Sequence, residues 1–132
     1  MKSLLFLILA VFVSGCSIEG SLVSEKGAVY LETDKGLYHS GEIIKINSVI
    51  NSSSAFNDVK VRFYGIYAGR YRLDSNKTVD LIEGKNNITF DYKAPNCYGC
   101  SGIKPGTYSI NVDVIYNNST IGSKSIDIEI RQ

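Results

Sequence analysis

Apolar and polar residues alternate along most of the chain beyond residue 27, and turn-forming residues separate the alternating stretches. Because successive side chains of a β-strand point to opposite faces, each stretch predicts a strand with one buried and one solvated side. The longest alternation covers 108–116, where Ser109, Asn111 and Asp113 are expected to meet water. The last one, 126–130, places isoleucine at every inward position. The pattern therefore predicts an all-β protein.

Further strands are expected at 28–32, 42–51, 59–64, 71–73, 78–82 and 87–93. Within 42–51 the alternation gives an inward set of Ile44, Ile46, Ser48 and Ile50. About seven or eight short strands in 28–132 would not suit one open sheet, because an open sheet leaves an apolar face in water. We therefore expect a sandwich of two packed antiparallel sheets.

Turn-forming residues predict how these strands are joined. The turn 83–85 is expected to make a hairpin of 78–82 and 87–93. Glycines at 65 and 69 predict a bulge or a bend after 59–64, and the polar stretch from Asp74 is interpreted as a solvated hairpin turn. Between the first two strands the pattern predicts an irregular passage that ends in the turn 39–41.

The first residues differ in composition from the rest of the chain. An uninterrupted apolar run, Leu4–Val13, follows Lys2. Its length of about ten residues is that of a signal-peptide core and roughly half of what a bilayer-spanning helix needs. The next segment, Val13–Cys16, resembles the lipobox of prokaryotic lipoprotein precursors. The resemblance implies cleavage before Cys16 and lipid on its sulfur; the alternatives are an ordinary cleaved signal and an uncleaved membrane anchor.

This leader divides the chain into three parts: a signal peptide at 1–15, a lipidated cysteine with a flexible tether at 16–27, and one β-domain at 28–132. The tether holds few apolar residues and is expected to keep the domain away from the lipid. The implied location is the extracytoplasmic side of a cell membrane, to which covalent lipid attaches the protein.

Two segments of the β-domain resemble known modules. The segment 33–42, Thr-Asp-Lys-Gly-Leu-Tyr-His-Ser-Gly-Glu, is similar to the opening of macroglobulin-type and adhesion-type immunoglobulin-like domains. The segment 105–108, Pro-Gly-Thr-Tyr, looks like the entry to a late strand in many such bacterial and archaeal modules. The resemblance implies an immunoglobulin-like sandwich. It implies no catalytic residue, because the thioester of macroglobulins belongs to a different domain.

Composition and charge narrow the classes of partner. Ile, Val, Tyr, Thr, Ser, Asn and Gly dominate the domain, which is a β composition, and Trp is absent. The chain carries 14 Lys and Arg, of which Lys2 lies in the leader, against 13 Asp and Glu. This near balance leaves no basic field that would hold nucleic acid.

The cysteines left after lipidation form one close pair, Cys97 and Cys100. In an oxidising compartment they are expected to form a disulfide, since the ends of a β-turn lie within about 7 Å and a disulfide accepts Cα separations up to about 6.8 Å. The bridge would stiffen a loop that displays Tyr98 to a partner. A thiol-disulfide oxidoreductase is the alternative, although strands rather than an activating helix flank the pair.

A second candidate binding surface is rich in tyrosine and arginine and comprises Arg62, Tyr64, Tyr67, Arg70, Tyr71 and Arg72. These two residue types are enriched at the centres of protein interfaces. In the alternative interpretation the tyrosines complete the core and the arginines extend along its edge.

Residues for catalysis or metal binding are sparse. His39 is the single histidine and falls in a predicted turn, and no Gly-x-Ser-x-Gly segment is present. One Cys-x-x-Cys and a distant histidine fall short of a zinc site. The stretch from Asp74 to Asp80 lacks the glycine and the distal glutamate of a calcium loop. We therefore expect no enzyme activity, cofactor or metal.

Asn-x-Ser/Thr sequons begin at Asn51, Asn76, Asn87, Asn117 and Asn118, at or near predicted turns. They are glycosylation candidates in an exported archaeal chain, or simply good turn residues. Taken together, the sequence predicts a lipid-anchored, non-catalytic β-sandwich that binds another surface protein or a glycan, or serves as an accessory subunit of a cell-surface complex.

Overall fold

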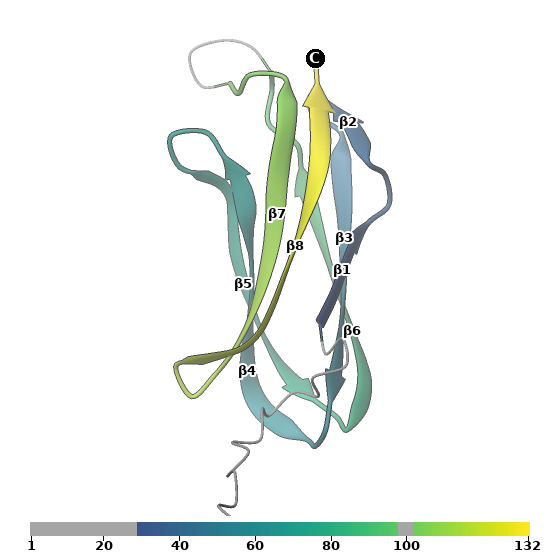
Figure 1. Ribbon diagram of the computed structural model, residues 1–132, viewed down its shortest axis with the longest axis vertical. Helices are drawn as coiled ribbons and strands as arrows, with labels where there is room; N and C mark the ends of the chain where they lie inside the picture. The colour runs from purple at the N-terminus through teal and green to yellow at the C-terminus, as the bar shows by residue number, and fades with distance from the viewer. Residues whose placement is uncertain (1–28, 98–101) are drawn as a thin grey trace, which may run out of the picture.

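The computed structural model describes residues 29–97 and 102–132, which form eight strands in two facing sheets (Figure 1). Sheet A has the order β1 (Val29–Thr33), β3 (Ile43–Ser52) and β6 (Gly84–Lys93). Sheet B has the order β2 (Leu37–His39), β8 (Ser119–Arg131), β7 (Gly106–Tyr116), β4 (Phe56–Tyr67) and β5 (Tyr71–Leu81). The prediction of an all-β sandwich of two sheets is confirmed. In the described residues, no helix has the length and apolar character to cross a membrane.

The inward faces follow the alternation of the sequence. The predicted inward residues of β3 are all buried: Ile44, Ile46, Ser48 and Ile50. Ser48 is tolerated there because its hydroxyl donates to the carbonyl of Tyr30 at 3.0 Å, which satisfies a polar group away from water. In β4 and β7 the predicted valines and Phe63 are also fully buried. Phe63 stacks on Phe90 of β6, with ring centroids 5.5 Å apart, and thereby joins the two sheets.

The prediction of purely antiparallel sheets is wrong at β2. After β1 the chain crosses from sheet A to sheet B and keeps its direction, so β2 pairs in parallel with β8. Asp34 fixes this corner: its carboxylate accepts hydrogen bonds from the hydroxyl of buried Tyr38 at 2.5 Å and from the backbone N–H of Lys45 at 3.1 Å. The segment 33–42 thus contains a short strand where the sequence predicts an irregular passage, and its Asp and Tyr hold the corner.

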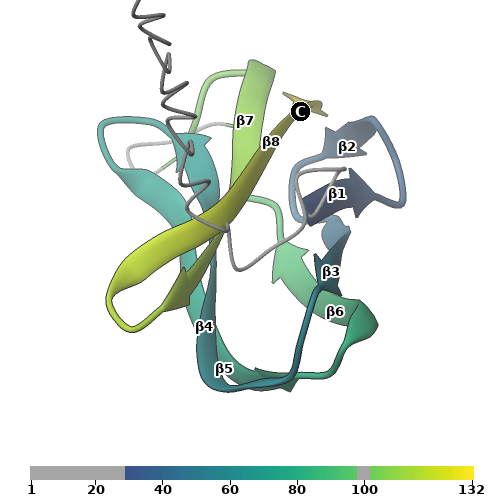
Figure 2. The ribbon, with the colours of Figure 1, turned by 60° about the horizontal axis from the view of Figure 1, so that its bottom comes forward.

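The predicted hairpin across 83–85 is also wrong, because β5 and β6 lie in different sheets. Figure 2 shows that this connection and the one from β3 to β4 cross between the sheets at the same end of the sandwich. Asn86 holds the crossing: its Oδ1 accepts from the N–H of Ile82 at 2.9 Å, and its Nδ2 lies 2.9 Å from the carbonyl of Ile82, 3.1 Å from that of Gly84 and 3.2 Å from that of Ile50. Alternation alone does not reveal which sheet a strand joins.

The stretch from Asp74 forms the middle of a strand rather than a hairpin turn. β5 is one continuous edge strand that pairs with β4 over its whole length, and the actual turn between them is 68–70. The predicted irregularity at Gly65 exists, because the φ of Gly65 is 154° and that of Ile66 is 49°. Ile66 is turned into the core by this backbone and is fully buried. The irregularity shifts the alternation, which places Tyr67 on the outer face together with Tyr64.

Candidate functional site

A cluster of aromatic side chains lies on the outer face of sheet B, on β4 and β5. We call it the tyrosine cluster: Arg62, Tyr64, Tyr67 and Tyr71. The rings of Tyr64 and Tyr71 meet edge to face with centroids 5.2 Å apart, and those of Tyr67 and Tyr71 do so at 5.3 Å. Tyr67 is 62% exposed and Tyr71 is 45% exposed, although both are large aromatic residues. The cluster therefore presents ring surface to solvent outside the core.

An ion pair holds the arginine of the cluster in place. Arg62 Nε lies 2.9 Å from Asp74 Oδ1 and its Nη2 lies 3.1 Å from Oδ2, a two-point geometry that fixes the guanidinium plane. The guanidinium carbon sits 4.3 Å from the centroid of the Tyr64 ring. The hydrogen bonds that Arg62 donates to the Asp74 carboxylate lower the pKa of Asp74 and raise the pKa of Arg62. Each partner thus neutralises the other and keeps the cluster ordered.

The other two arginines named from the sequence lie apart from the cluster. Arg70 is exposed in the β4–β5 turn. Arg72 is half-buried; its Nη2 lies 3.4 Å from the carbonyl of Ala68, and its own carbonyl accepts from the hydroxyl of Tyr92 at 2.8 Å. The structure therefore brings Arg62 and the three tyrosines together and uses Arg72 at the margin between the sheets.

Two hollows adjoin the cluster. β4 stops pairing with β7 after Gly65, where any side chain would overlap the backbone of β7. Beside this point lies the upper hollow, of about 330 Å³, lined by Gly65, Tyr67, Tyr71, Thr107, Tyr108, Ser109 and Asn111. The lower hollow, of about 320 Å³, is lined by Tyr64, Asn111, Asp113, Ser123, Lys124 and Ser125. Because Asn111 borders both, the two hollows are neighbours across β4, β7 and β8, and we call them together the trough.

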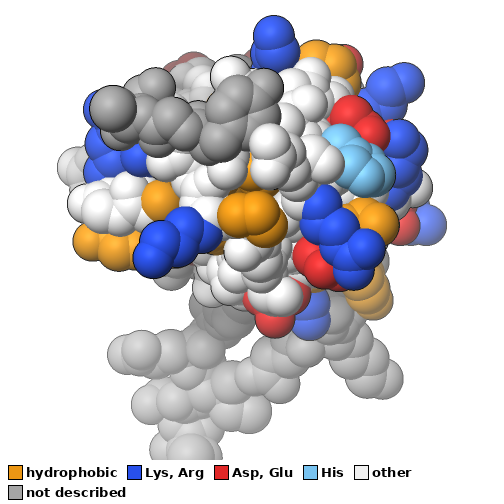
Figure 3. Space-filling view, turned by 90° about the horizontal axis from the view of Figure 1, so that it is seen from above, with side chains coloured by type: hydrophobic (Ala, Val, Ile, Leu, Met, Phe, Trp, Pro, Cys, Tyr) orange, Lys and Arg blue, Asp and Glu red, His pale blue; other side chains and the backbone are white. Residues whose placement is uncertain are grey.

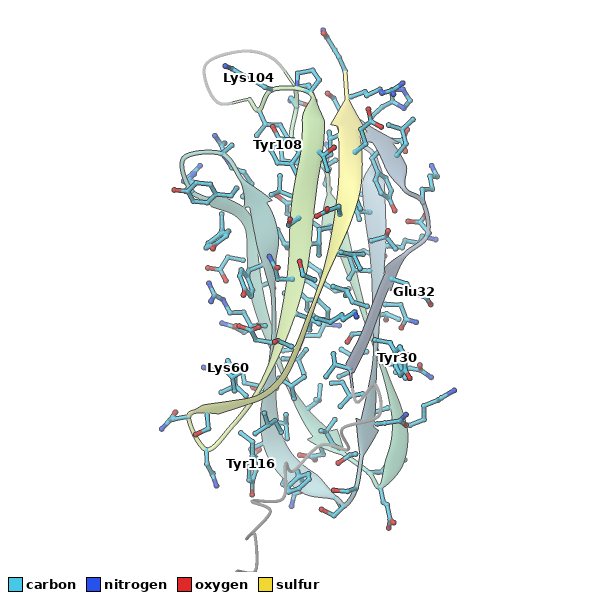
Figure 4. The ribbon with its side chains drawn as sticks, viewed as in Figure 1. Tyr30, Glu32, Lys60, Lys104, Tyr108 and Tyr116 are labelled. Atoms are coloured by element: carbon cyan, nitrogen blue, oxygen red, sulfur yellow. The ribbon has the colours of Figure 1, made fainter. Side chains whose placement is uncertain are left out.

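The β7 and β8 side of this trough is not indicated by the residue pattern of the sequence. The alternation over 108–116 predicts only that Ser109, Asn111 and Asp113 face water, and it puts Tyr108 on the opposite side of the strand, where the ring does pack against the core. Tyr108 is half-buried, its hydroxyl donates to the carbonyl of Lys104, and both residues lie at the start of β7 (Figure 4). The available signal was the row of polar residues on β7 that faces the tyrosines of β4, but only the register shows that the two rows adjoin.

The outer face of sheet A has two larger hollows, of about 540 and 460 Å³, which share Glu32 and Asn47. Their aromatic lining consists of Tyr30, which is 51% exposed and projects from β1 (Figure 4). Asn47 donates to Glu32 Oε1 at 3.1 Å across the floor. Aromatic side chains and arginine supply much of the energy at interface centres. These hollows have one aromatic ring in their lining, whereas the outer face of sheet B carries a cluster of three tyrosines and an arginine, so we regard sheet B as the better candidate.

Several predicted site residues lie outside the described residues, namely Cys16, Tyr98 and Cys100. The lipid anchor and the Cys97–Cys100 disulfide therefore stay predictions. Cys97 is buried, with 6% of its surface exposed, and its backbone N–H donates to Ser40 Oγ at 2.9 Å. It thus belongs to the buried core.

The sequons do not all lie at turns. Asn117 and Asn118 form the β7–β8 turn, with φ values of 49° and 62°, and both are exposed. Asn76 is exposed in the middle of β5, Asn87 is exposed on β6, and Asn51 is half-buried near the end of β3. Four of the five asparagines are therefore accessible to a glycan, and the exception is Asn51.

His39 lies on the surface, as the sequence analysis expected. Its Nδ1 is 3.2 Å from Glu42 Oε1, and Figure 3 shows the single histidine beside acidic and basic side chains at one end of the sandwich. Within residues 29–97 and 102–132, no three His, Cys, Asp or Glu side chains are grouped so that they could hold a metal ion.

No protein-family model and no curated protein matches the chain, but solved structures do. The CARDB domain of a Pyrococcus furiosus protein, solved by NMR, is 17% identical over 79% of this chain and 94% of that domain, with a TM-score of 0.56. A crystal structure of that domain in complex with di-metal ions is 18% identical over 79% of this chain and 91% of that one, with a TM-score of 0.57.

A Paenibacillus sp. cycloisomaltooligosaccharide glucanotransferase complexed with cycloisomaltoheptaose also matches, at 18% identity and a TM-score of 0.60. The match covers 76% of this chain and 13% of that enzyme. At these identities the likeness establishes the fold, which is the immunoglobulin-like β-sandwich of CARDB domains, and not a ligand or an activity.

Proposed function

We propose that this protein is a non-catalytic binding module, held on the outer side of a cell membrane by lipid on Cys16, that engages its partner through the tyrosine cluster. The observation that carries the proposal is the exposure of Tyr67 and Tyr71 in a cluster ordered by the Arg62–Asp74 ion pair.

An ordered aromatic cluster favours binding for two reasons. Tyrosine and arginine supply much of the energy at interface centres, because their large surfaces lose contact with water on binding. Side chains that are already fixed lose little conformational entropy when a partner arrives. The ring contacts of Tyr71 with Tyr64 and Tyr67, together with the two-point Arg62–Asp74 pair, provide such fixation.

The position of the cluster suits a tethered module. The described chain begins at Val29, which pairs with Ile50 near the end of β3, whereas Tyr67 and Tyr71 flank the β4–β5 turn at the opposite end of the sandwich. A tether from Cys16 to residue 27 would thus leave the cluster on the part of the domain farther from the membrane. The likeness of segment 33–42 to adhesion-type modules fits the same role.

We do not favour thiol-disulfide exchange as the function. Its attacking thiolate needs access to solvent, and Cys97 is buried, with 6% of its surface exposed.

The anchor is tested by mass spectrometry of the chain purified from membranes of cells that express it. The proposal expects an N-terminus at Cys16 carrying lipid, and it expects the Cys16→Ala variant to leave the membrane fraction or to keep residues 1–15. An intact leader with unmodified Cys16 would overturn the proposed anchoring.

The binding face is tested by a photo-crosslinking amino acid placed in the full chain in living cells. Tyr67 and Tyr30 are similarly exposed, at 62% and 51%, but they lie on opposite faces of the sandwich. We expect a discrete adduct from position 67 and none from position 30. Equal adducts from both positions, or none from either, would contradict the assignment of the face.

A further inference from the structure

We propose that the trough formed by the tyrosine cluster and its two hollows binds an uncharged oligosaccharide. This inference rests on the proposed function only in that both use the outer face of sheet B, and it does not depend on the lipid anchor.

The shape of the trough favours a short chain of small units. Its hollows measure about 330 and 320 Å³ and share Asn111 in their linings. Each is at the lower end of the range of about 300–1,000 Å³ that is usual for small-molecule sites. A ligand made of similar units joined end to end can place one unit in each hollow, whereas a single compact molecule would fill one of them.

The side chains of the trough match the two kinds of surface that a sugar ring presents. The C–H groups of a sugar carry partial positive charge and pack on the negative face of an aromatic ring. Tyr67, Tyr71 and Tyr108 supply aromatic surface around the upper hollow. Sugar hydroxyls both donate and accept hydrogen bonds. The lower hollow offers the carboxylate of Asp113, hydroxyl and ammonium groups from 123–125, and the Oδ1 of Asn111, whose Nδ2 already donates to the carbonyl of Tyr64 at 3.2 Å.

Charge at the site disfavours an anionic ligand. Arg62 is already paired with Asp74, and in the lower hollow Lys124 is accompanied by the carboxylate of Asp113. A phosphate or an acidic polymer would therefore meet as many negative groups as positive ones, without the excess of cations on which such recognition depends.

The position of the trough also disfavours a peptide that adds as an extra strand. Strand addition needs a free sheet edge with unpaired backbone groups. The trough lies inside sheet B, whose edge strands are β2 and β5; beneath it, β7 pairs with β8 along its length and with β4 from Ile110 to Ile115. A ligand there must be recognised by side chains, as an oligosaccharide is.

The test uses the full chain in detergent micelles, first on an array of uncharged oligosaccharides of two to six units built from glucose, galactose, mannose and N-acetylglucosamine. The strongest hit is then measured by isothermal titration calorimetry. Truncation of one interface aromatic residue is expected to weaken binding about tenfold, so Tyr67→Ala and Tyr71→Ala should each reduce affinity by roughly that factor. Ser125→Ala should weaken it by a smaller factor.

Tyr30→Ala is the matched control, because Tyr30 is a similarly exposed tyrosine on the outer face of sheet A. The affinity of this variant should stay within about twofold of that of the wild type. Since the side chains of Tyr67 and Tyr71 lie outside the core, unchanged urea midpoints will show that the variants are folded. Absence of binding across the array, binding to acidic glycans alone, or equal loss in Tyr30→Ala would overturn the inference. If the array fails while crosslinking from position 67 succeeds, the binding face stands and its partner is a protein; failure of both removes the proposed function as well.

Discussion

Replacing Asn86 with alanine should destabilise the sandwich at the point where the chain passes from one sheet to the other. The amide of Asn86 accepts one hydrogen bond, from the N–H of Ile82, and its two hydrogens are shared among the carbonyls of Ile50, Ile82 and Gly84. At most three of these interactions can therefore be well formed at once.

The size of the effect follows from the surroundings of each bond. A hydrogen bond contributes about 1 kcal/mol net, and an acceptor that loses its partner away from water costs more. The carbonyl of Ile50 is part-buried, while the groups of Ile82 and Gly84 lie at the surface and can be hydrated after truncation. We expect a loss of about 2 kcal/mol in the free energy of unfolding, which at a typical slope of about 2 kcal/mol per M lowers the urea midpoint by roughly 1 M.

Equilibrium unfolding in urea, followed by tyrosine fluorescence, measures this midpoint, and two variants serve as controls. Asn86→Asp keeps the acceptor for Ile82 and loses both donors, so its midpoint should lie between those of the wild type and Asn86→Ala. Asn87→Ala removes the neighbouring exposed amide and should change stability by less than about 0.5 kcal/mol. A midpoint for Asn86→Ala equal to that of Asn87→Ala would refute the claim that this side chain holds the crossing.

Three other outcomes are expected. The hydroxyl of Tyr38 lowers the pKa of Asp34, so the ionised carboxylate stabilises the fold at pH values above its unfolded pKa, and this contribution is lost as the pH falls through the folded pKa. In Tyr38→Phe, NMR titration of the carboxyl group should therefore show a higher pKa for Asp34. An unchanged titration would contradict this coupling. Gly65→Ala should lower the free energy of unfolding by more than about 2 kcal/mol, because its side chain would overlap the β7 backbone, and a urea midpoint like that of the wild type would count against that close approach. Under native conditions with mild reductant, Cys97 and Cys100 should resist alkylation as a structural disulfide, whereas rapid reduction and reoxidation would support a redox role.

The sequence predicted the layers of the fold because alternation reports directly which side of a strand is buried. The rule applies even to a polar residue, because Ser48 is buried at the inward position that the alternation predicts for it. Alternation does not encode the pairing partner, so the hairpin at 83–85 and the parallel β2 could not be derived from it. Both depend on side chains that hold a crossing, Asn86 and Asp34, whose role is visible only when their backbone partners are known.

The candidate site was predictable in part for a similar reason. The tyrosines and Arg62 stood out by residue type, but a regular strand would have placed Tyr64 and Tyr67 on opposite faces. The positive φ values of Gly65 and Ile66 bring them to one face, and the β4–β7 register places Asn111 beside Tyr64. The backbone angles at 65–66 and the pairing of β4 with β7 cannot be derived from the residue types of β4 alone.

The central claim is that the domain is displayed outside the cytoplasm with its tyrosine cluster covered by a partner. Tyrosine iodination by a membrane-impermeant enzyme, read by peptide mass spectrometry, tests it on intact cells and on the purified full chain. Tyr30, Tyr67 and Tyr71 are 51%, 62% and 45% exposed and should all react in the purified chain. On intact cells we expect Tyr30 to react and Tyr67 and Tyr71 to be protected. Equal labelling of all three on cells, or labelling of Tyr30 only after lysis, would contradict the account.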